Sequence, residues 1–258
     1  MIHVSRLHVS RENSEVLHNL TASFPEGKVT VILGPNGCGK STFLKTLVRL
    51  LPVSSGKIEV AGRPLEEYDQ KELARLVTYL PQSRSVPDIT VMRLVLHGRF
   101  PYLGYPRKYR KEDRDLVKEA LCRLDIEALS ERKMESLSGG QRQKVYLAMA
   151  MVQQTAVIML DEPTTFLDIR NQFEILDHAR MLAGQGKTVI MILHDFDAAL
   201  QYADQVILMD AGSIRKTGTA MEVLRSPKIE EIFGVTPVLY ELEDGWHCMV
   251  RPAGRRKV

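Results

Sequence analysis

The amino-acid sequence predicts an α/β fold with a mainly parallel sheet. Three observations support this prediction: short apolar runs rich in β-branched residues recur, helical patterns lie between them, and one long middle segment is helical throughout. The runs are too short for buried helices, and several precede polar or glycine-rich turns, so each is expected to form a strand covered on both faces. These strands are predicted at Val29–Leu33, Val77–Leu80, Val157–Leu160, Val189–Leu193 and Val206–Met209.

Two helices are predicted next to these strands. Ser41–Leu51 follows a glycine-rich loop, and Asn171–Ala183 ends before a pair of glycines. The second helix is expected to bury one apolar stripe, which consists of Phe173, Leu176 and Ala179 or Leu182.

The middle of the chain differs because helical periodicity continues there without a strand pattern. One helix is predicted within residues 113–126 and another at Gln141–Gln153. The apolar positions of the first helix are Leu116, Ala120, Leu121 and Leu124. A helical subdomain of residues 88–152 is therefore expected as an insertion into an α/β core of residues 1–87 and 153–220.

The core is predicted to end in a hairpin, with Val206–Met209 and Ser213–Lys216 as its strands and Asp210–Gly212 as its turn. Residues 221–258 lack a regular pattern and are expected to form an irregular C-terminal extension. Arg255–Lys257 are expected to be a solvated tail. The whole chain, residues 1–258, is expected to form one domain organised in this way.

Composition excludes several classes of protein. Hydrophobic residues make up 44% and charged residues 26% of the chain, which excludes collagen-like, low-complexity and disordered proteins. The net charge of +3 is too small to indicate nucleic acid or an anionic membrane as a partner. Met1–Arg6 does not resemble a secretory signal and no window approaches the ~18 apolar residues of a membrane span, so a cytoplasmic chain is expected. The 3 cysteines, Cys38, Cys122 and Cys248, are expected to be reduced thiols.

Residues 34–41 match the phosphate-loop pattern G-x-x-x-x-G-K-[ST] between a predicted strand and a predicted helix. Phosphates require backbone N–H donors at close range, which glycines permit, and a helix N-terminus adds a favourable dipole. Lys40 is expected at the β- and γ-phosphates and Ser41 at Mg²⁺; the alternative is a turn that merely joins strand to helix. The nucleotide-binding residues predicted here are Gly34, Pro35, Asn36, Gly37, Cys38, Gly39, Lys40, Ser41 and Thr42.

Two acids end the apolar strand Val157–Leu160. Buried carboxylates are unfavourable unless a cation or a proton accompanies them. Asp161 therefore suits the Mg²⁺ shell through water, and Glu162 suits a base that polarises the attacking water. An ordinary charged strand end is the alternative, and the phosphate loop in the same chain disfavours it.

A second phosphate site is predicted at Leu137–Gln141, which has the sequence LSGGQ. Ser138 and Gln141 fit a capping box, and the two glycines between them leave N–H groups accessible at a helix N-terminus. A nucleotide has one γ-phosphate, so two such sites in one chain indicate sharing across a dimer. The predicted contacts are Ser138, Gly139, Gly140 and Gln141.

In this order, the phosphate loop, the LSGGQ segment and the LDEP strand end resemble the nucleotide-binding subunit of an ABC transporter over about residues 1–220. The resemblance implies a P-loop NTPase core of the RecA-like type, an N-terminal antiparallel β part and an inserted helical signature subdomain. It also implies that Gln82 is the Q-loop glutamine, Thr165–Asp168 the D-loop and His194 the switch histidine. Mg-dependent ATP hydrolysis would then use Lys40, Gln82, Glu162 and His194 as catalytic residues and Ser41, Gln82 and Asp161 as metal ligands.

Residues 34–41, His97–Tyr102 and Asp161–Asp168 further resemble the importer ATPases for iron–siderophore complexes, haem and cobalamin. This resemblance implies a homodimer on the cytoplasmic face of the membrane, bound peripherally to permease subunits and served by an extracytoplasmic substrate-binding protein. Ferric siderophore is the substrate expected, with haem or cobalamin as the alternative. Arg99–Arg114 combines 6 basic residues with aromatic ones, a pattern also typical of single-strand nucleic-acid binding. The resemblance instead implies a surface for the permease and lipid headgroups, with a solvated loop as the alternative, and no nucleic acid as partner.

One position departs from the family pattern. When the family pattern is aligned on Val16–Leu17 and Gly27–Lys28, Arg11 stands where an aromatic residue usually stacks on adenine. A planar guanidinium also stacks on a base, so the departure concerns affinity or base selectivity.

Three other functions are alternatives for such a sequence: a soluble ABC ATPase of translation or DNA repair, an exporter subunit, and a P-loop kinase or switch. Translation factors usually carry two signatures in one chain and repair proteins a long coiled-coil insertion, and this sequence has neither. The LSGGQ segment disfavours a kinase, and the likeness of His97–Tyr102 to importers disfavours an exporter.

Overall fold

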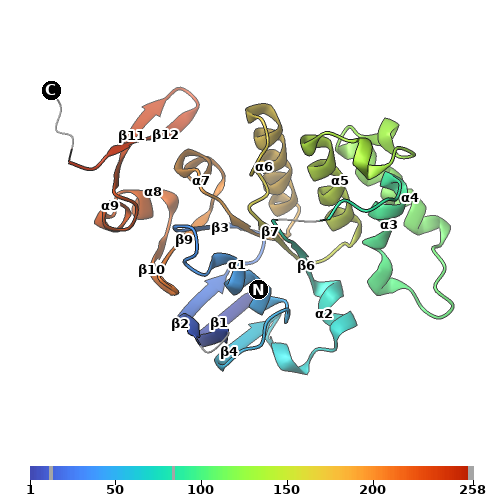
Figure 1. The fold of residues 1–258 in the computed structure, drawn as a ribbon, viewed down its shortest axis with the longest axis horizontal. Helices are drawn as coiled ribbons and strands as arrows, with labels where there is room; N and C mark the ends of the chain where they lie inside the picture. Colours follow the sequence, from blue (N-terminus) through green and yellow to red (C-terminus); the bar gives the residue numbers. More distant parts are fainter. Residues whose placement is uncertain (12–13, 83–84, 255–258) are drawn as a thin grey trace. The chain divides into compact units, whose positions relative to one another are not determined.

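The computed structural model describes residues 1–11, 14–82 and 85–254 and divides the chain into two compact units (Figure 1). Unit 1 consists of Met1–Glu67 and Ala179–Val258, and unit 2 of Tyr68–His178. The subdomain limits at residues 88 and 152 stay a prediction, because this division follows compactness rather than the change from strands to helices. The predicted tail at Arg255–Lys257 lies outside the described residues.

The N-terminal part of unit 1 is a four-stranded sheet with the order β2-β1-β4-β5 and antiparallel pairing, as the resemblance implied. Side chains along β1 alternate, so that Ile2, Val4, Leu7 and Val9 are buried. The alternation shifts by one residue at Arg6, whose φ of 46° accompanies an irregularity in the pairing. The strands are β1 (Ile2–Arg11), β2 (Ser14–Phe24), β4 (Ser55–Val60) and β5 (Arg63–Pro64).

The second sheet of unit 1 has β3 between two parallel neighbours, β8 and β9, and a hairpin joins β9 to β10. β3 and β8 are buried along their whole length, which their continuous apolar runs predicted. Ala211 and Gly212, with φ of 44° and 72°, form the predicted hairpin turn. The strands are β3 (Val29–Leu33), β8 (Thr188–Ile192), β9 (Gln205–Asp210) and β10 (Ser213–Gly218).

The C-terminal extension is regular, so the expectation of an irregular segment was wrong. It forms α8 (Ala220–Leu224), α9 (Pro227–Phe233) and an antiparallel hairpin of β11 (Val235–Leu242) and β12 (Gly245–Pro252), drawn in red in Figure 1. Local signals for these elements were present. Thr219 and Glu222 form a capping box, Ser226 caps a helix with proline in its first turn, and Gly245 turns the hairpin with φ 129°.

Unit 2 pairs two parallel strands, β6 and β7, and continues into helices and turns between Val91 and Val152, as the helical periodicity predicted. The strands are β6 (Val77–Leu80) and β7 (Val157–Asp161), and the helices are α2 (Gln70–Leu76), α3 (Val91–His97), α4 (Lys111–Arg123) and α5 (Gly139–Val152). Short 3₁₀ turns lie at Leu65–Glu67 in unit 1 and at Phe100–Tyr102, Glu127–Leu129 and Met134–Ser136 in unit 2. Within the described part of the chain, no helix is long and apolar enough to cross a bilayer.

Two helix predictions need correction. α1 (Lys40–Leu47) ends four residues before Leu51, because Arg49 takes a left-handed φ of 57° and a residue before proline, here Leu51, disfavours helical backbone. α6 (Ile169–Gly184) buries the predicted Leu176, Ala179 and Leu182, but Phe173 is 50% exposed because the buried stripe lies on the Ile175 side of the helix.

Candidate active site

The glycine-rich loop between β3 and α1 requires glycine at specific positions. A Cβ on Gly34 would lie 2.4 Å from the carbonyl oxygen of Met209, so no larger residue fits without movement of the backbone. Gly37 and Gly39 have φ of 78° and 102°, a backbone conformation that other residues rarely adopt. Nothing lies within 4 Å of a Cβ on Gly37, which leaves the loop open on that side.

Lys40 is a buried cation whose hydrogen-bond partners are uncharged. Its side chain is 5% exposed, and its ammonium donates to the carbonyl oxygens of Gly34 at 2.7 Å and Pro35 at 2.9 Å. A buried charge is unfavourable without a counter-charge, so the loop fits an anion such as a nucleotide phosphate. Ser41 and Thr42 follow in the first turn of α1, where both are half-buried.

Cys38 differs from a reactive thiol at a helix N-terminus. Its residue is 6% exposed, and burial raises the pKa of the thiol although the Lys40 charge lowers it. A Cβ on Gly34 would lie 2.7 Å from Sγ of Cys38, so the sulfur packs against the start of the loop. The nearby Lys40 and helix N-terminus favour a thiolate, but burial has the larger effect on the pKa of Cys38.

His194 leaves the sheet beside the phosphate loop, because β3 and β8 are parallel and in register. Ile32 is opposite Ile192, and the N–H of Leu193 donates to the carbonyl oxygen of Ile32 at 3.3 Å. The phosphate loop follows the end of β3, and the exposed His194 follows the adjacent end of β8. Asp195 follows and caps α7 (Phe196–Tyr202).

The two acids of unit 2 stand at the end of β7, beside the end of β6. Leu80 is opposite Leu160, which brings Gln82 level with Glu162, and the Gln82 amide Nε2 donates to Glu162 Oε2 at 2.5 Å. Thr165 Oγ1 donates to the same carboxylate oxygen at 3.2 Å. Glu162 has φ 51°, a left-handed conformation that costs about 1 kcal/mol or more for a non-glycine residue.

Asp161 is held by a residue that the sequence analysis missed. Its side chain is buried, with the residue 2% exposed, and Tyr79 OH donates to its Oδ2 at 2.8 Å. Tyr79 lies in β6, so only the register between two strands far apart in sequence brings the phenol to the acid. The hydrogen bond orients the carboxylate.

The LSGGQ segment begins α5 with the predicted capping box. Ser138 Oγ accepts from the N–H of Gln141 at 3.3 Å, and Gln141 Oε1 accepts from the N–H of Ser138 at 3.1 Å. The two glycines differ: a Cβ on Gly139 meets nothing within 4 Å, whereas one on Gly140 would lie 2.6 Å from Cγ of Asn171. Sequence analysis missed Asn171 because no pattern at position 171 indicates this contact.

Asn171 connects the second glycine to the D-loop. Its backbone N–H donates to Asp168 Oδ1 at 2.9 Å and its side-chain amide to Asp168 Oδ2 at 2.7 Å. These hydrogen bonds hold the pKa of Asp168 below its ordinary value. Two segments singled out in the sequence are thus in contact through one amide side chain.

The basic segment 99–114 is only partly exposed to solvent. Arg99 is 9% exposed; its Nε donates to Asp113 Oδ1 at 2.8 Å and its Nη1 to the carbonyl oxygen of Val152 at 2.9 Å. Burial alone would raise the pKa of Asp113, but the Arg110 N–H and the Arg99 guanidinium outweigh it and hold the pKa below its ordinary value. Arg99 therefore belongs to the interior rather than to a surface for a permease or lipid.

The predicted site residues divide between the two units. Unit 1 brings together the phosphate loop and His194. Unit 2 brings together Gln82, Asp161 and Glu162 at its strand ends. Unit 2 also contains Ser138–Gln141, at the start of α5. Each unit thus carries polar and charged groups suited to bind phosphates or a hydrated cation.

The profile of the family described as ABC transporter matches residues 17–165, more than half of the chain. The chain belongs to this family. Membership confirms the P-loop NTPase fold and the ATPase activity that the phosphate loop, the LSGGQ segment and the LDEP strand end predicted.

Curated relatives of this ABC ATPase align over most of their length. It is 39% identical over 242 residues to the ferric enterobactin transport ATP-binding protein FepC of Escherichia coli (strain K12), covering 93% of the chain and 89% of the relative. It is 39% identical over 222 residues to the iron(3+)-hydroxamate import ATP-binding protein FhuC of Bacillus subtilis (strain 168), covering 85% and 82%. It is 36% identical over 240 residues to the hemin import ATP-binding protein HmuV of Shewanella denitrificans, covering 90% and 93%.

Solved structures show the same fold. The chain superposes on a metal-chelate type ABC transporter in an inward-facing conformation with a TM-score of 0.85, at 28% identity and 97% and 96% coverage of the two chains. It superposes on cbiO1 of Clostridium perfringens, part of the ABC transporter complex cbiONQ, with a TM-score of 0.77, at 29% identity and 90% and 98% coverage.

In this ABC ATPase, Arg11 is the last residue of β1. It is exposed and opposite Ser14, whose hydroxyl donates to the Arg11 carbonyl oxygen at 3.0 Å. Contact between Arg11 and adenine stays a prediction.

Proposed function

We propose that the chain hydrolyses ATP to drive an ABC importer of ferric siderophore complexes. The observation that supports this substrate is the similarity, at 39% identity, to subunits named for ferric enterobactin transport and iron(3+)-hydroxamate import. The 36% identity to a hemin import subunit supports haem as the second candidate. The chain would act on the cytoplasmic face of the membrane with permease subunits, and an extracytoplasmic binding protein would deliver the cargo.

Phosphate binding follows from the loop of unit 1. Lys40 would transfer its hydrogen bonds from the Gly34 and Pro35 carbonyls to the β- and γ-phosphates, where an ammonium stabilises charge that develops on transfer. The backbone N–H groups of the loop and the N-terminus of α1 would hold the remaining phosphate oxygens. The contacts proposed in the loop are Gly34, Pro35, Asn36, Gly37, Cys38, Gly39, Lys40, Ser41 and Thr42.

Mg²⁺ would be held by oxygens from three side chains: the Ser41 hydroxyl, the Gln82 amide and, through water, the Asp161 carboxylate. When bound, the ion neutralises charge on the phosphates. These donors fit because hard oxygen ligands suit Mg²⁺, and the Asp161 carboxylate is buried at the strand end, where Tyr79 OH orients it through Oδ2.

Water activation is assigned to Glu162 and His194. Glu162 would accept a proton from the attacking water, and the Gln82 amide that contacts its Oε2 would orient the carboxylate. His194 would position the water and the γ-phosphate from the end of β8.

A homodimer would complete each site, with Ser138, Gly139, Gly140 and Gln141 of one subunit on the nucleotide held by the loop of the other. The accessible start of α5 supports this arrangement, because Gly139 has open space around it and the capping box fixes the first turn. Mixing Lys40→Ala with Ser138→Arg chains should restore one intact site per heterodimer. Light scattering with Mg-ATP should detect closed dimers in the mixture and few in either variant alone; tight dimers of both single variants would contradict sharing.

Catalysis is tested by Glu162→Gln in the purified chain. Loss of a general base should lower turnover by about 10²-fold or more while nucleotide binding persists. Turnover close to that of the wild type would remove Glu162 from the role of base.

The substrate is tested by deleting the coding gene in the source organism and measuring uptake of labelled iron as siderophore complex, as haem, and of cobalamin. Loss of siderophore uptake alone is expected, and re-expression of the Glu162→Gln chain should not restore it. Selective loss of haem or cobalamin uptake would instead assign the alternative cargo.

A further inference from the structure

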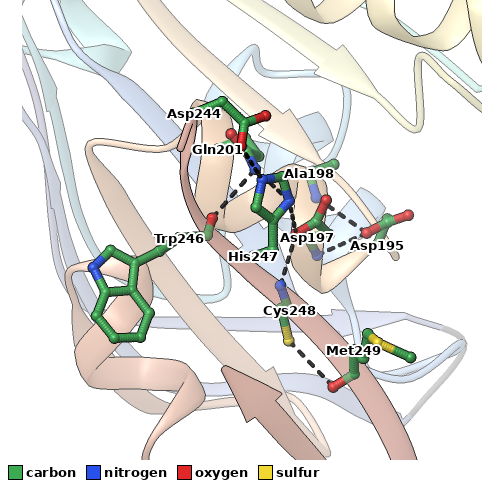
Figure 2. A network of polar contacts seen from close by, with 9 residues as sticks. All are labelled: Asp195, Asp197, Ala198, Gln201, Asp244, Trp246, His247, Cys248 and Met249. Atoms are coloured by element: carbon green, nitrogen blue, oxygen red, sulfur yellow. Dashed lines mark hydrogen bonds and ion pairs between the residues drawn. The ribbon is translucent and has the colours of Figure 1, made fainter. Parts of the chain in front are cut away.

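The C-terminal hairpin contacts α7 directly after the switch histidine (Figure 2). Asp197 Oδ1 accepts a hydrogen bond from the backbone N–H of Cys248 at 2.7 Å, and His247 Nδ1 lies 3.4 Å from the same oxygen. One turn further along α7, Gln201 Nε2 donates to the carbonyl oxygen of Trp246 at 3.2 Å. β12 is thus attached to the first two turns of α7 by polar contacts.

His194 directly precedes Asp195, the N-cap of α7. Asp195 Oδ1 accepts from the N–H groups of Asp197 at 2.7 Å and Ala198 at 3.0 Å, so the residue after His194 is bonded to the turn that β12 holds. Phe196 is buried and meets Phe233 of α9 edge to face, with ring centroids 5.1 Å apart. The backbone that follows His194 is therefore held by the hydrogen bonds of Asp195 and by the packing of Phe196.

A pocket of about 550 Å³ lies beside His194, and its wall includes Asp197, Phe233, Cys248 and Val250. Side chains do not fill this space, so packing alone does not fix the position of the histidine. The hydrogen-bonded frame of Asp195, Asp197 and β12 supplies a constraint on the backbone next to it.

The hairpin contributes little to the core. Of its described residues 235–252, Cys248 is the one buried side chain, at 8% exposure, whereas Val238, Met249 and Val250 are 41–62% exposed. Its polar contacts with α7 lie at Asp197, three residues after His194, and at Gln201, one turn further along the helix.

We propose that the C-terminal hairpin positions His194 for catalysis, with Asp197 as the positioning residue that joins β12 to the start of α7. The inference rests on the proposed role of His194 in hydrolysis. The hairpin acts through the backbone: Cys248 N–H holds Asp197, the helix turn holds Asp195, and Asp195 sets the direction in which His194 leaves β8.

The test is a double-mutant cycle on the purified full chain, with steady-state ATPase rates and binding of a fluorescent ATP analogue. Asp197→Ala should lower kcat about tenfold and leave nucleotide affinity within about twofold, because a misplacement of about 1 Å costs up to ~10²-fold in rate. Asp197→Asn keeps an acceptor for the Cys248 N–H and should retain most of the rate. Glu243→Ala, an exposed change in the hairpin turn, is the matched control and should have no effect.

His194→Ala is the second arm of the cycle. If Asp197 acts through His194, adding Asp197→Ala to His194→Ala should lower the rate by less than about twofold. An equal loss in both backgrounds would overturn the inference, since it would show an independent structural defect. If His194→Ala lowers turnover and Asp197→Ala does not, the inference alone falls; if His194→Ala leaves turnover unchanged, the proposed role of His194 falls and the inference with it.

A second variant acts from the hairpin and covers the case of a poorly folded Asp197→Ala chain. Cys248→Pro removes the N–H that Asp197 accepts, because proline has no backbone donor. Trp246 still lies under the guanidinium of Arg225, 5.5 Å from the ring centroid, so the hairpin keeps a second attachment. The same fall in kcat and faster amide exchange in residues 194–202 are expected; wild-type kcat with faster exchange would overturn the inference.

Discussion

Replacing Gly140 with alanine is expected to destabilise unit 2 through its contact with Asn171. The added Cβ would lie 2.6 Å from Cγ of Asn171 and 2.7 Å from both terminal atoms of the amide. An ordinary carbon–carbon contact needs about 3.5 Å, so the amide must withdraw by roughly 0.9 Å. Gly139 is the matched control, because its Cβ would meet nothing within 4 Å in the same helix turn.

The loss in the free energy of unfolding is estimated from the hydrogen bond that the Asn171 amide would lose. Asn171 Nδ2 donates to Asp168 Oδ2 at 2.7 Å, and withdrawal breaks or lengthens this bond to a carboxylate, which is worth about 1.5–3 kcal/mol. Alanine recovers up to about 1 kcal/mol of helix propensity relative to glycine. Gly140→Ala should therefore lower the free energy of unfolding by about 0.5–2 kcal/mol, whereas Gly139→Ala should leave it unchanged or raise it by up to ~1 kcal/mol.

Urea unfolding followed by far-ultraviolet circular dichroism measures both variants. Asn171→Gly removes the amide that the new methyl group meets, so it should suppress the loss caused by Gly140→Ala. Equal unfolding midpoints for the two alanine variants, or no suppression by Asn171→Gly, would refute the proposed clash.

Four further predictions concern an internal ion pair, its pH dependence, thiol accessibility and nucleotide selectivity. Arg99→Ala should lower the free energy of unfolding by about 3 kcal/mol or more, as urea unfolding will show, because it leaves the buried Asp113 without its guanidinium. Because the folded-state pKa of Asp113 lies below its unfolded value of about 3.9, its contribution to stability is present above that pH and lost as pH falls through the folded pKa; Asp113→Asn should flatten the acid side of a stability–pH curve. Exposed Cys122 should react with maleimide well before buried Cys38, with or without Mg-ATP, as mass spectrometry of the labelled peptides will show. Calorimetry should find GTP bound within about tenfold of ATP if Arg11 replaces an aromatic platform, and a much larger preference for ATP would contradict that register.

Elements with local signals could be predicted from the amino-acid sequence alone. The apolar run Val29–Leu33, the glycines after it and the helix that begins at Lys40 identify the phosphate loop without any distant partner. The capping box at Ser138 is equally local, because its two members are three residues apart. The acids after Leu160 were identified in the same way, from a strand that ends in charge.

Within the C-terminal extension, the local signals were also present, but weak alternation over two exposed strands concealed them. The hairpin of β11 and β12 has one buried side chain, Cys248, so the apolar periodicity that identifies core strands is missing. Its contacts with Asp197 depend on docking against α7, which no property of either segment alone indicates.

The contacts between side chains distant in sequence depend on how the elements pack. Tyr79 and Asp161 are 82 residues apart, and the parallel register of β6 and β7 brings them within a hydrogen bond. Arginine usually lies on the protein surface, yet folding pairs Arg99 with Asp113 in the interior. Sequence periodicity specifies which face of an element is apolar, but hydrogen bonds extend only about 3 Å, so the pairing of polar groups is set when elements distant in sequence pack in one particular register.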